Sequence, residues 1–110
     1  MNKKENTNNE VINFIETFNV YIGKKINFKE AICTNQENFD RHFTTFSSTE
    51  FILTDFGARI SGARIMFGGE KLNYEISFDR ITKFEKNENQ IIIFEAYSEN
   101  IIRRTFVNIL

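Results

Sequence analysis

Hydrophobic side chains recur at helical spacing near the N-terminus and at alternate positions over the second half of the chain. Apolar residues three or four positions apart predict a helix over residues 8–18, whose apolar stripe is formed by Val11, Phe14, Ile15 and Phe18. The segment Thr7-Asn8-Asn9-Glu10 matches a capping box, which marks a helix start. Residues 1–7 are polar, so we expect them to be frayed.

A second helix is predicted over residues 35–46. Thr34-Asn35-Gln36-Glu37 is another capping box, and the residues at helical spacing behind it are Phe39, His42, Phe43 and Phe46. Between the two helices, residues 19–33 carry apolar positions on either side of Gly23-Lys24-Lys25. This pattern favours a short hairpin or an irregular crossing.

After residue 49 the pattern changes to period-two segments that are broken by Gly, Asn and Ser. The predicted strands are 50–60, 63–67, 71–78, 81–86, 90–97 and 101–109. The sequence therefore predicts an α+β fold, with two N-terminal helices packed on an antiparallel β-meander of about five to six strands. Because no linker divides the chain, residues 1–110 are expected to form a single domain.

The first hairpin has a testable register. If Ser61-Gly62 is a two-residue turn, Phe56 faces Phe67 on the apolar side of the hairpin. The same register places Arg59 opposite Arg64 on the other side. Because like charges directly opposite are unfavourable, we expect an acidic side chain nearby.

The last hairpin and the C-terminal strand are harder to place. A turn at Glu99-Asn100 would pair Glu95 with Arg104. Residues 105–110 carry no charge and no proline, so their backbone groups need a partner strand. That partner is either an earlier strand, which would close a small barrel, or a second copy of the chain across a two-fold axis. Closure within a monomer is favoured over the homodimer because it needs no partner chain.

Composition and charge exclude several classes of protein. The chain of 110 residues has 14 basic and 15 acidic side chains and a net charge of -1, which argues against a general nucleic-acid coat protein. No apolar run is long enough to cross a membrane. The single Cys33 excludes an intramolecular disulfide and favours a reducing compartment. We therefore expect a cytoplasmic protein. Asn, Ile, Lys and Phe are abundant in the chain and have codons rich in A and T, so we expect a bacterial host or its phage.

No catalytic motif is evident in the sequence. Asp55-Phe56-Gly57 spells the metal-binding triplet of protein kinases but lacks the other kinase motifs. Cys33 and His42 are the one pair that fits a Cys/His hydrolase, and packed, structural roles are favoured for both. We expect no enzymatic activity, no cofactor and no metal site.

Arginines provide the clearest binding signal. Guanidinium groups bind carboxylates and phosphates through two parallel hydrogen bonds and are enriched at interface hot spots. The predicted partner-binding residues are Arg59, Arg64, Arg80, Arg103 and Arg104. The alternative is ordinary ion pairing with neighbours such as Glu75 and Glu95.

Three resemblances extend this interpretation. A helix followed by a meander over residues 50–109 resembles Sm-type small barrels, and residues 75–81 leading into 90–94 resemble the strand rhythm of bacterial PH-like domains. In general character the chain is similar to small phage-encoded inhibitors of bacterial defence, including anti-CRISPR proteins. That similarity implies a protein that occludes a surface of its partner.

Two functions are therefore expected. The first is a non-enzymatic protein-binding module that inhibits a bacterial defence nuclease, for example a Cas nuclease. The second is a small barrel that binds single-stranded nucleic acid through aromatic and basic side chains. The residues available for that second function are Tyr21, Tyr74, Tyr97, Arg103 and Arg104.

Overall fold

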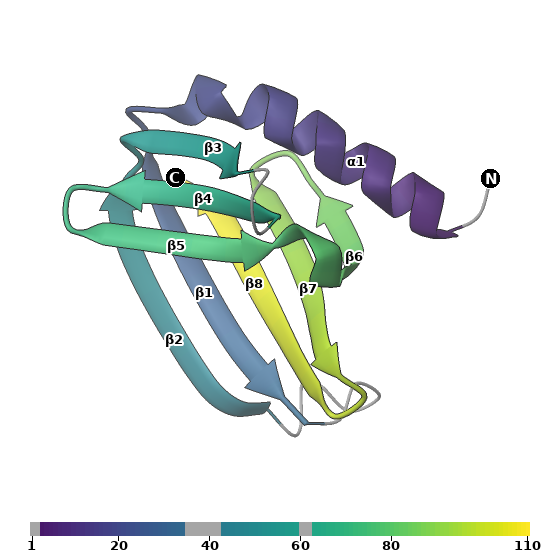
Figure 1. Ribbon diagram of the computed structural model, residues 1–110. Coiled ribbons are helices and arrows are strands. Elements are labelled where there is room, and N and C mark those ends of the chain that lie inside the picture. The colour runs from purple at the N-terminus through teal and green to yellow at the C-terminus, as the bar shows by residue number, and fades with distance from the viewer. Residues whose placement is uncertain (1–2, 35–42, 60–62) are drawn as a thin grey trace.

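In the computed structural model, which describes residues 3–34, 43–59 and 63–110, one α-helix precedes eight strands in two antiparallel sheets (Figure 1). The elements are α1 (Lys3–Thr17), η1 (Phe18–Tyr21), β1 (Lys25–Cys33), β2 (Phe43–Ile52), β3 (Asp55–Arg59), β4 (Arg64–Gly69), β5 (Leu72–Ser77), η3 (Phe78–Arg80), β6 (Ile81–Lys86), β7 (Gln90–Ser98) and β8 (Ile101–Ile109). One sheet has the order β2-β1-β8-β7-β6 and the other β3-β4-β5. The predicted α+β class is confirmed.

Helix α1 confirms the predicted apolar stripe but not the predicted start. Val11 and Phe14, together with Phe18 at the start of η1, are each 1% exposed. The helix begins at Lys3, so Thr7 lies inside it and the predicted capping box is wrong. The helix extends beyond its apolar stripe because polar residues also propagate a helix that tertiary packing has anchored.

The second predicted helix is wrong where the structure describes it. Residues 43–46 belong to β2, and residues 35–42 lie outside the described part of the chain. Strand β2 pairs with β1, which is one continuous strand rather than a hairpin within residues 19–33. Gly23, with a φ of 95°, supplies the turn into β1. Pairing with β1 therefore outweighs the helical spacing of the phenylalanines.

The predicted strand 50–60 is two strands in two different sheets. Leu53 is fully buried at the break, where its N–H donates to the Lys24 carbonyl and its own carbonyl accepts from Gly23. Beyond the break, the Thr54 N–H donates to the Gly68 carbonyl, which starts the second sheet. The apolar positions change from odd numbers, Phe51 and Leu53, to even numbers, Phe56 and Ala58, at this corner.

The C-terminal strand lies inside the larger sheet. β8 pairs with β1 on one side and with β7 on the other, so its backbone groups are satisfied within the chain. The predicted pairing with an earlier strand is confirmed by β1, but among the described residues the sheet ends at β2 and β6 and does not close into the expected barrel. The predicted single meander is correspondingly two shorter ones, β3-β4-β5 in the smaller sheet and β6-β7-β8 in the larger sheet, where β1 and β2 are added next to β8.

The structure confirms the predicted register of the first hairpin and corrects that of the last. Phe56 pairs with Phe67 and Arg59 with Arg64, which confirms the register of the first hairpin. In the last hairpin a bulge between Ala96 and Ser98 shifts the pairing by one residue, so Glu95 faces Arg103 and the predicted Glu95–Arg104 pair is wrong. The bulge reverses which side chains share a face.

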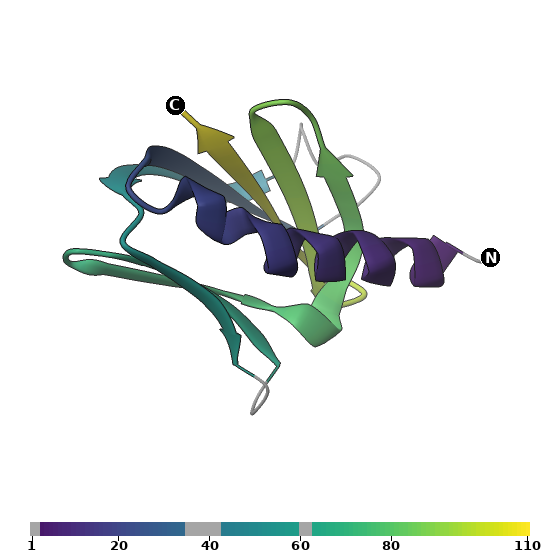
Figure 2. The same cartoon turned by 90° about the horizontal axis from the view of Figure 1, so that it is seen from above.

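A core rich in phenylalanine lies between the two sheets. Helix α1 and the three-stranded sheet both lie on one side of the five-stranded sheet, and α1 crosses the open end between the sheets (Figures 1 and 2). Phe14, Phe18 and Phe67 are among the largest fully buried side chains. No described helix or strand covers the opposite side of the larger sheet, which we call the outer face.

Helix α1 is not of the membrane-spanning kind. Among the described residues no helix has the length and apolar character needed to cross a membrane.

Candidate functional site

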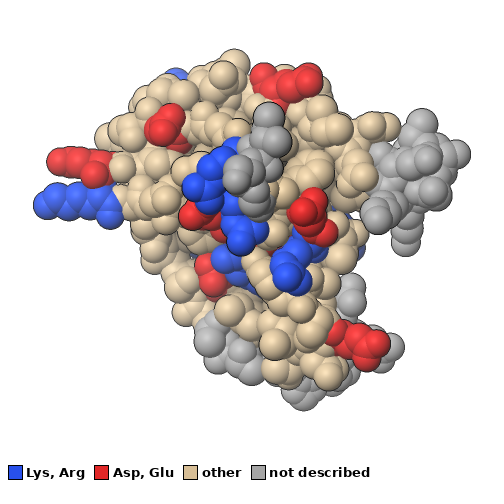
Figure 3. All heavy atoms as spheres, in the orientation of Figure 1, with Lys and Arg blue, Asp and Glu red and all other residues tan. Residues whose placement is uncertain are grey.

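Four of the five predicted arginines gather on one side of the molecule. Arg59 and Arg64 are cross-strand partners on β3 and β4, Arg80 lies in η3, and Arg103 projects from β8 toward the second sheet. Figure 3 shows basic side chains gathering near the centre of this side. We call this surface the arginine face and define it as Arg59, Arg64, Arg80, Arg103 and Tyr97. Arg104 points to the outer face, so the structure does not bring it to the other four.

The hairpin arginines are held by residues of β5. Arg59 Nη2 lies 3.5 Å from Glu75 Oε1, which confirms the expectation of an acidic side chain near the pair. Arg64 Nη1 donates to Ser77 Oγ over 2.9 Å. The Arg59–Glu75 contact joins two exposed side chains, so it contributes about 0–1 kcal/mol to stability and is easily exchanged for another partner.

A small apolar pocket lies beside these two arginines. Its volume is about 190 Å³, and it is lined by Ile15, Ala58, Arg59, Ala63, Arg64, Ile65 and Phe78. The lining comes from α1, the β3–β4 hairpin and η3, so the pocket exists only where these three meet. We call it the hairpin pocket. Its interior is apolar, and Arg59 and Arg64 lie in its lining while their guanidinium groups contact Glu75 and Ser77 on β5.

Tyr97 connects the surface arginines with the interior. The guanidinium carbons of Arg80 and Arg103 lie 4.9 and 5.9 Å from the centre of its ring. Its hydroxyl donates to Glu95 Oε2 over 2.6 Å, and Arg80 Nη1 donates to its backbone carbonyl over 3.4 Å. Burial, followed by the hydrogen bond to Glu95, raises the pKa of Tyr97 above its ordinary value. The ring therefore stays neutral between two cations.

Glu95 is a fully buried carboxylate beneath the arginine face. Its Oε1 accepts from Arg103 Nε at 2.8 Å and lies 2.7 Å from Arg103 Nη2. Its Oε2 accepts from the Ser77 N–H over 2.9 Å and from the Tyr97 hydroxyl. Arg103 Nη2 also donates to the Glu75 carbonyl over 2.8 Å. This network joins β7 and β8 of one sheet to β5 of the other and fixes where Arg103 and Tyr97 lie.

Tyr74 extends the same network across the interior. Its hydroxyl donates to Glu30 Oε2 over 2.7 Å and lies 3.0 Å from Thr105 Oγ1. Burial is the main cause that raises the pKa of Tyr74, and the nearby Glu30 carboxylate adds to it. Tyr74 is therefore a neutral, structural hydrogen-bond donor.

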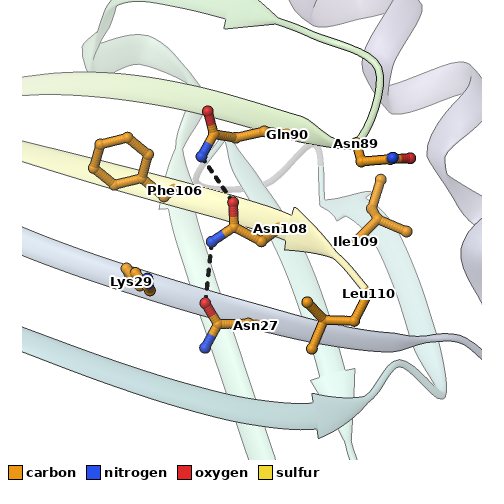
Figure 4. A pocket seen from close by; sticks show the side chains of 8 residues that line it. All are labelled: Asn27, Lys29, Asn89, Gln90, Phe106, Asn108, Ile109 and Leu110. Carbon is orange, nitrogen blue, oxygen red and sulfur yellow. Dashed lines mark hydrogen bonds between the residues drawn. The ribbon is translucent and has the colours of Figure 1, made fainter.

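A larger pocket lies on the outer face, at the start of β1 and the end of β8 (Figure 4). Its volume is about 670 Å³, and it is lined by Asn27, Lys29, Asn89, Gln90, Phe106, Asn108, Ile109 and Leu110. Three of these amides form a chain of hydrogen bonds across the strands, which we call the amide row. Gln90 Nε2 donates to Asn108 Oδ1 over 2.9 Å, and Asn108 Nδ2 donates to Asn27 Oδ1 over 3.0 Å.

Sequence reasoning missed this pocket because its residues are far apart along the chain. A usable signal was present: Asn27 lies between Ile26 and Phe28, and Asn108 between Val107 and Ile109. An amide between two apolar residues of a strand marks the polar side of that strand. Nothing in the sequence shows that the two amides are neighbours.

Of the candidate catalytic pair, only Cys33 lies in the described part of the chain. Cys33 is fully buried at the end of β1, and His42 lies outside the described residues. Asp55-Phe56-Gly57 forms the start of β3. Within the described ranges, no three His, Cys, Asp or Glu side chains are placed to share a metal ion.

Comparison of the chain with protein-family profiles, with curated protein sequences and with solved structures gives no match.

Proposed function

We propose that this protein is a non-enzymatic protein-binding module whose partner docks on the arginine face. The observation that carries the proposal is the hairpin pocket, an apolar hollow of about 190 Å³ with Arg59 and Arg64 in its lining. Binding energy at protein interfaces concentrates where an anchor side chain fills such a pocket and arginines pair around it.

The chemistry of this surface suggests the chemistry of the partner. Ile15, Ile65 and Phe78 favour an apolar anchor, whereas the two guanidinium groups favour carboxylates next to that anchor. A partner carboxylate can replace Glu75 as the ion pair of Arg59 at little cost, because the existing contact is exposed. The proposed partner segment is therefore acidic, with one apolar side chain at its centre.

The specific form of the proposal is a phage-type inhibitor of a bacterial defence nuclease. Its support is the general similarity to small phage-encoded inhibitors noted from the sequence, together with the pocket and arginines just described. Such a protein would act by occluding a surface of the nuclease.

Pull-down and cleavage assays against a panel of Cas nucleases test this proposal. The informative variant is Arg59→Glu with Arg64→Glu, and the control is Lys71→Glu with Lys86→Glu. Both change the charge equally, and the control residues are exposed and lie outside the arginine face. We expect inhibition by the wild type and the control, and at least a ten-fold loss for the arginine variant, since each such anchor contributes about 2 kcal/mol.

Two results would reject the proposal. If no nuclease in the panel binds or is inhibited, the specific form is wrong. If a partner binds but both double variants weaken it equally, general electrostatics rather than the arginine face explains the binding. A thermal unfolding curve for each variant shows that it is folded under the assay conditions.

A single-stranded nucleic-acid binder is the second candidate, but not through Tyr74. Tyr74 packs against Phe28 and Phe67, with its hydroxyl bonded to Glu30, so its ring does not offer a free stacking surface. The outer face provides a different set of residues for this function.

A further inference from the structure

The amide row presents hydrogen-bonding groups in a fixed orientation. Each amide donates to the next, from Gln90 through Asn108 to Asn27, and Asn27 Nδ2 ends the row by donating to Ser48 Oγ over 3.1 Å. The Gln90 carbonyl oxygen and one N–H each of Gln90 and Asn108 have no hydrogen-bond partner among the described residues. Side-chain amides held in this way can donate to and accept from one edge of a nucleobase.

An aromatic ring and basic groups lie next to the amide row. Phe106 is the cross-strand partner of Lys29, and both line the same pocket. Lys29 is exposed and forms no ion pair with a described residue. The guanidinium of Arg104 lies 4.8 Å from the centre of the Phe106 ring. None of the residues that line the pocket is acidic. The lining therefore suits a ligand that combines a flat ring with an anionic group.

We propose that the outer-face pocket binds one base of a single-stranded nucleic acid. The base stacks on Phe106, its edge bonds to Gln90 and Asn108, and Lys29 pairs with the adjoining phosphate. The volume of about 670 Å³ accommodates a nucleotide, since small-molecule sites commonly measure about 300–1,000 Å³. This function is separate from the proposed protein binding, which uses the opposite side of the molecule.

The shape of the outer face favours a single strand over a duplex. Bases in a duplex are stacked on one another and expose only their edges. Phe106 is half-buried in the sheet surface with the Arg104 guanidinium on its ring, so only an unstacked base can reach the ring surface that remains. Open sheet faces with aromatic side chains bind single-stranded RNA in this manner. Arg104 lies next to Phe106 along β8 and extends the basic surface beyond the pocket, which suits a chain longer than one nucleotide.

Fluorescence anisotropy with labelled homopolymer oligonucleotides tests the proposal. The oligonucleotides are used in single-stranded and in duplex form, and mononucleotides serve as competitors. We expect single strands to bind, and to bind more tightly than duplexes or mononucleotides. Phe106→Ala should weaken binding about ten-fold, whereas Phe106→Tyr should retain it. Lys29→Gln should lower the slope of affinity against salt concentration by about one, and Lys71→Gln, on the β4–β5 turn, should leave it unchanged.

A second measurement does not depend on any variant being folded. In NMR spectra of the wild-type protein, the side-chain amide signals of Gln90, Asn108 and Asn27 should shift on titration with the oligonucleotide. The amide of Asn73, on β5, serves as the internal control. The proposal is wrong if single strands do not bind at low salt, if Phe106→Ala binds as well as the wild type, or if the Asn73 signal shifts as much as those of the amide row. The double variant Arg59→Glu with Arg64→Glu should still bind the oligonucleotide. This result would show that nucleic-acid binding does not depend on the arginine face, so the two proposals can fail independently.

Discussion

Replacing the buried carboxylate of Glu95 by an amide should destabilise the protein severely. Glu95→Gln keeps the size and shape of the side chain, so packing changes little. The carboxylate, which is fully buried, contacts Arg103 through one oxygen and the Ser77 N–H and Tyr97 hydroxyl through the other. Glutamine offers a single acceptor oxygen, and its NH₂ group must face a donor in either orientation.

The expected loss of stability follows from the charge that Glu95→Gln leaves unpaired. Without the carboxylate, the guanidinium of Arg103, whose side chain is 18% exposed, loses its closest counter-charge. The remaining acidic group near it, Glu30, is 3.9 Å away and already accepts from Tyr74. Breaking a buried ion pair from one side costs about 3–5 kcal/mol, a large part of the 5–15 kcal/mol that about 100-residue domains have in total. At about 4 °C per kcal/mol the melting temperature should fall by roughly 12–20 °C.

Urea denaturation followed by circular dichroism measures this loss. Glu85→Gln is the matched control, because Glu85 is paired with Lys83 at 2.9 Å on the surface and should cost less than about 1 kcal/mol. In the double variant Glu95→Gln with Arg103→Gln, the loss should be smaller than the sum of the two single losses, since both remove the same contact. If Glu95→Gln costs no more than Glu85→Gln, the assignment of Glu95 as a charged, buried partner of Arg103 is wrong.

Two further predictions concern the backbone and the interior tyrosine. Gly69→Ala should destabilise the protein by about 1–3 kcal/mol, because a Cβ there would lie 2.8 Å from Phe51 Cδ2. Gly57→Ala is the control: a Cβ at Gly57 would have no atom within 4 Å, so the stability should change by less than about 1 kcal/mol. Equal losses in urea denaturation would contradict this steric reasoning. The raised pKa of Tyr74 means that above about pH 10 the unfolded chain releases a proton that the folded protein keeps, so stability falls as pH rises. Tyr74→Phe should flatten this alkaline decline in urea midpoints, and an unchanged slope would show that Tyr74 ionises normally in the folded protein.

Local patterns in the sequence were enough to locate most elements. The strands predicted at 81–86 and 101–109 have those bounds in the structure, because alternation ended by turn residues is a property of neighbouring positions. The Arg59–Arg64 pairing was also predictable, since a two-residue turn fixes the register of the strands that it joins.

Tertiary contacts decided the rest of the fold. Residues 43–46 carry helical spacing, yet they extend because β1 offers a pairing edge. A bulge of one residue near Tyr97 exchanged Arg104 for Arg103 as the partner of Glu95, although the turn itself was predicted correctly. A bulge leaves no clear local signal because it depends on how the whole strand fits its neighbours.

Both candidate sites depend on these long-range contacts. The hairpin pocket needs α1 against the β3–β4 hairpin, and the amide row joins Asn27 to Asn108, which are 81 positions apart. The sequence alone determined which residues are polar, aromatic or basic and on which strand they lie. Only the insertion of β8 between β1 and β7 made neighbours of Asn27, Asn108 and Gln90, because strand order is set by burial of the shared core rather than by local propensity.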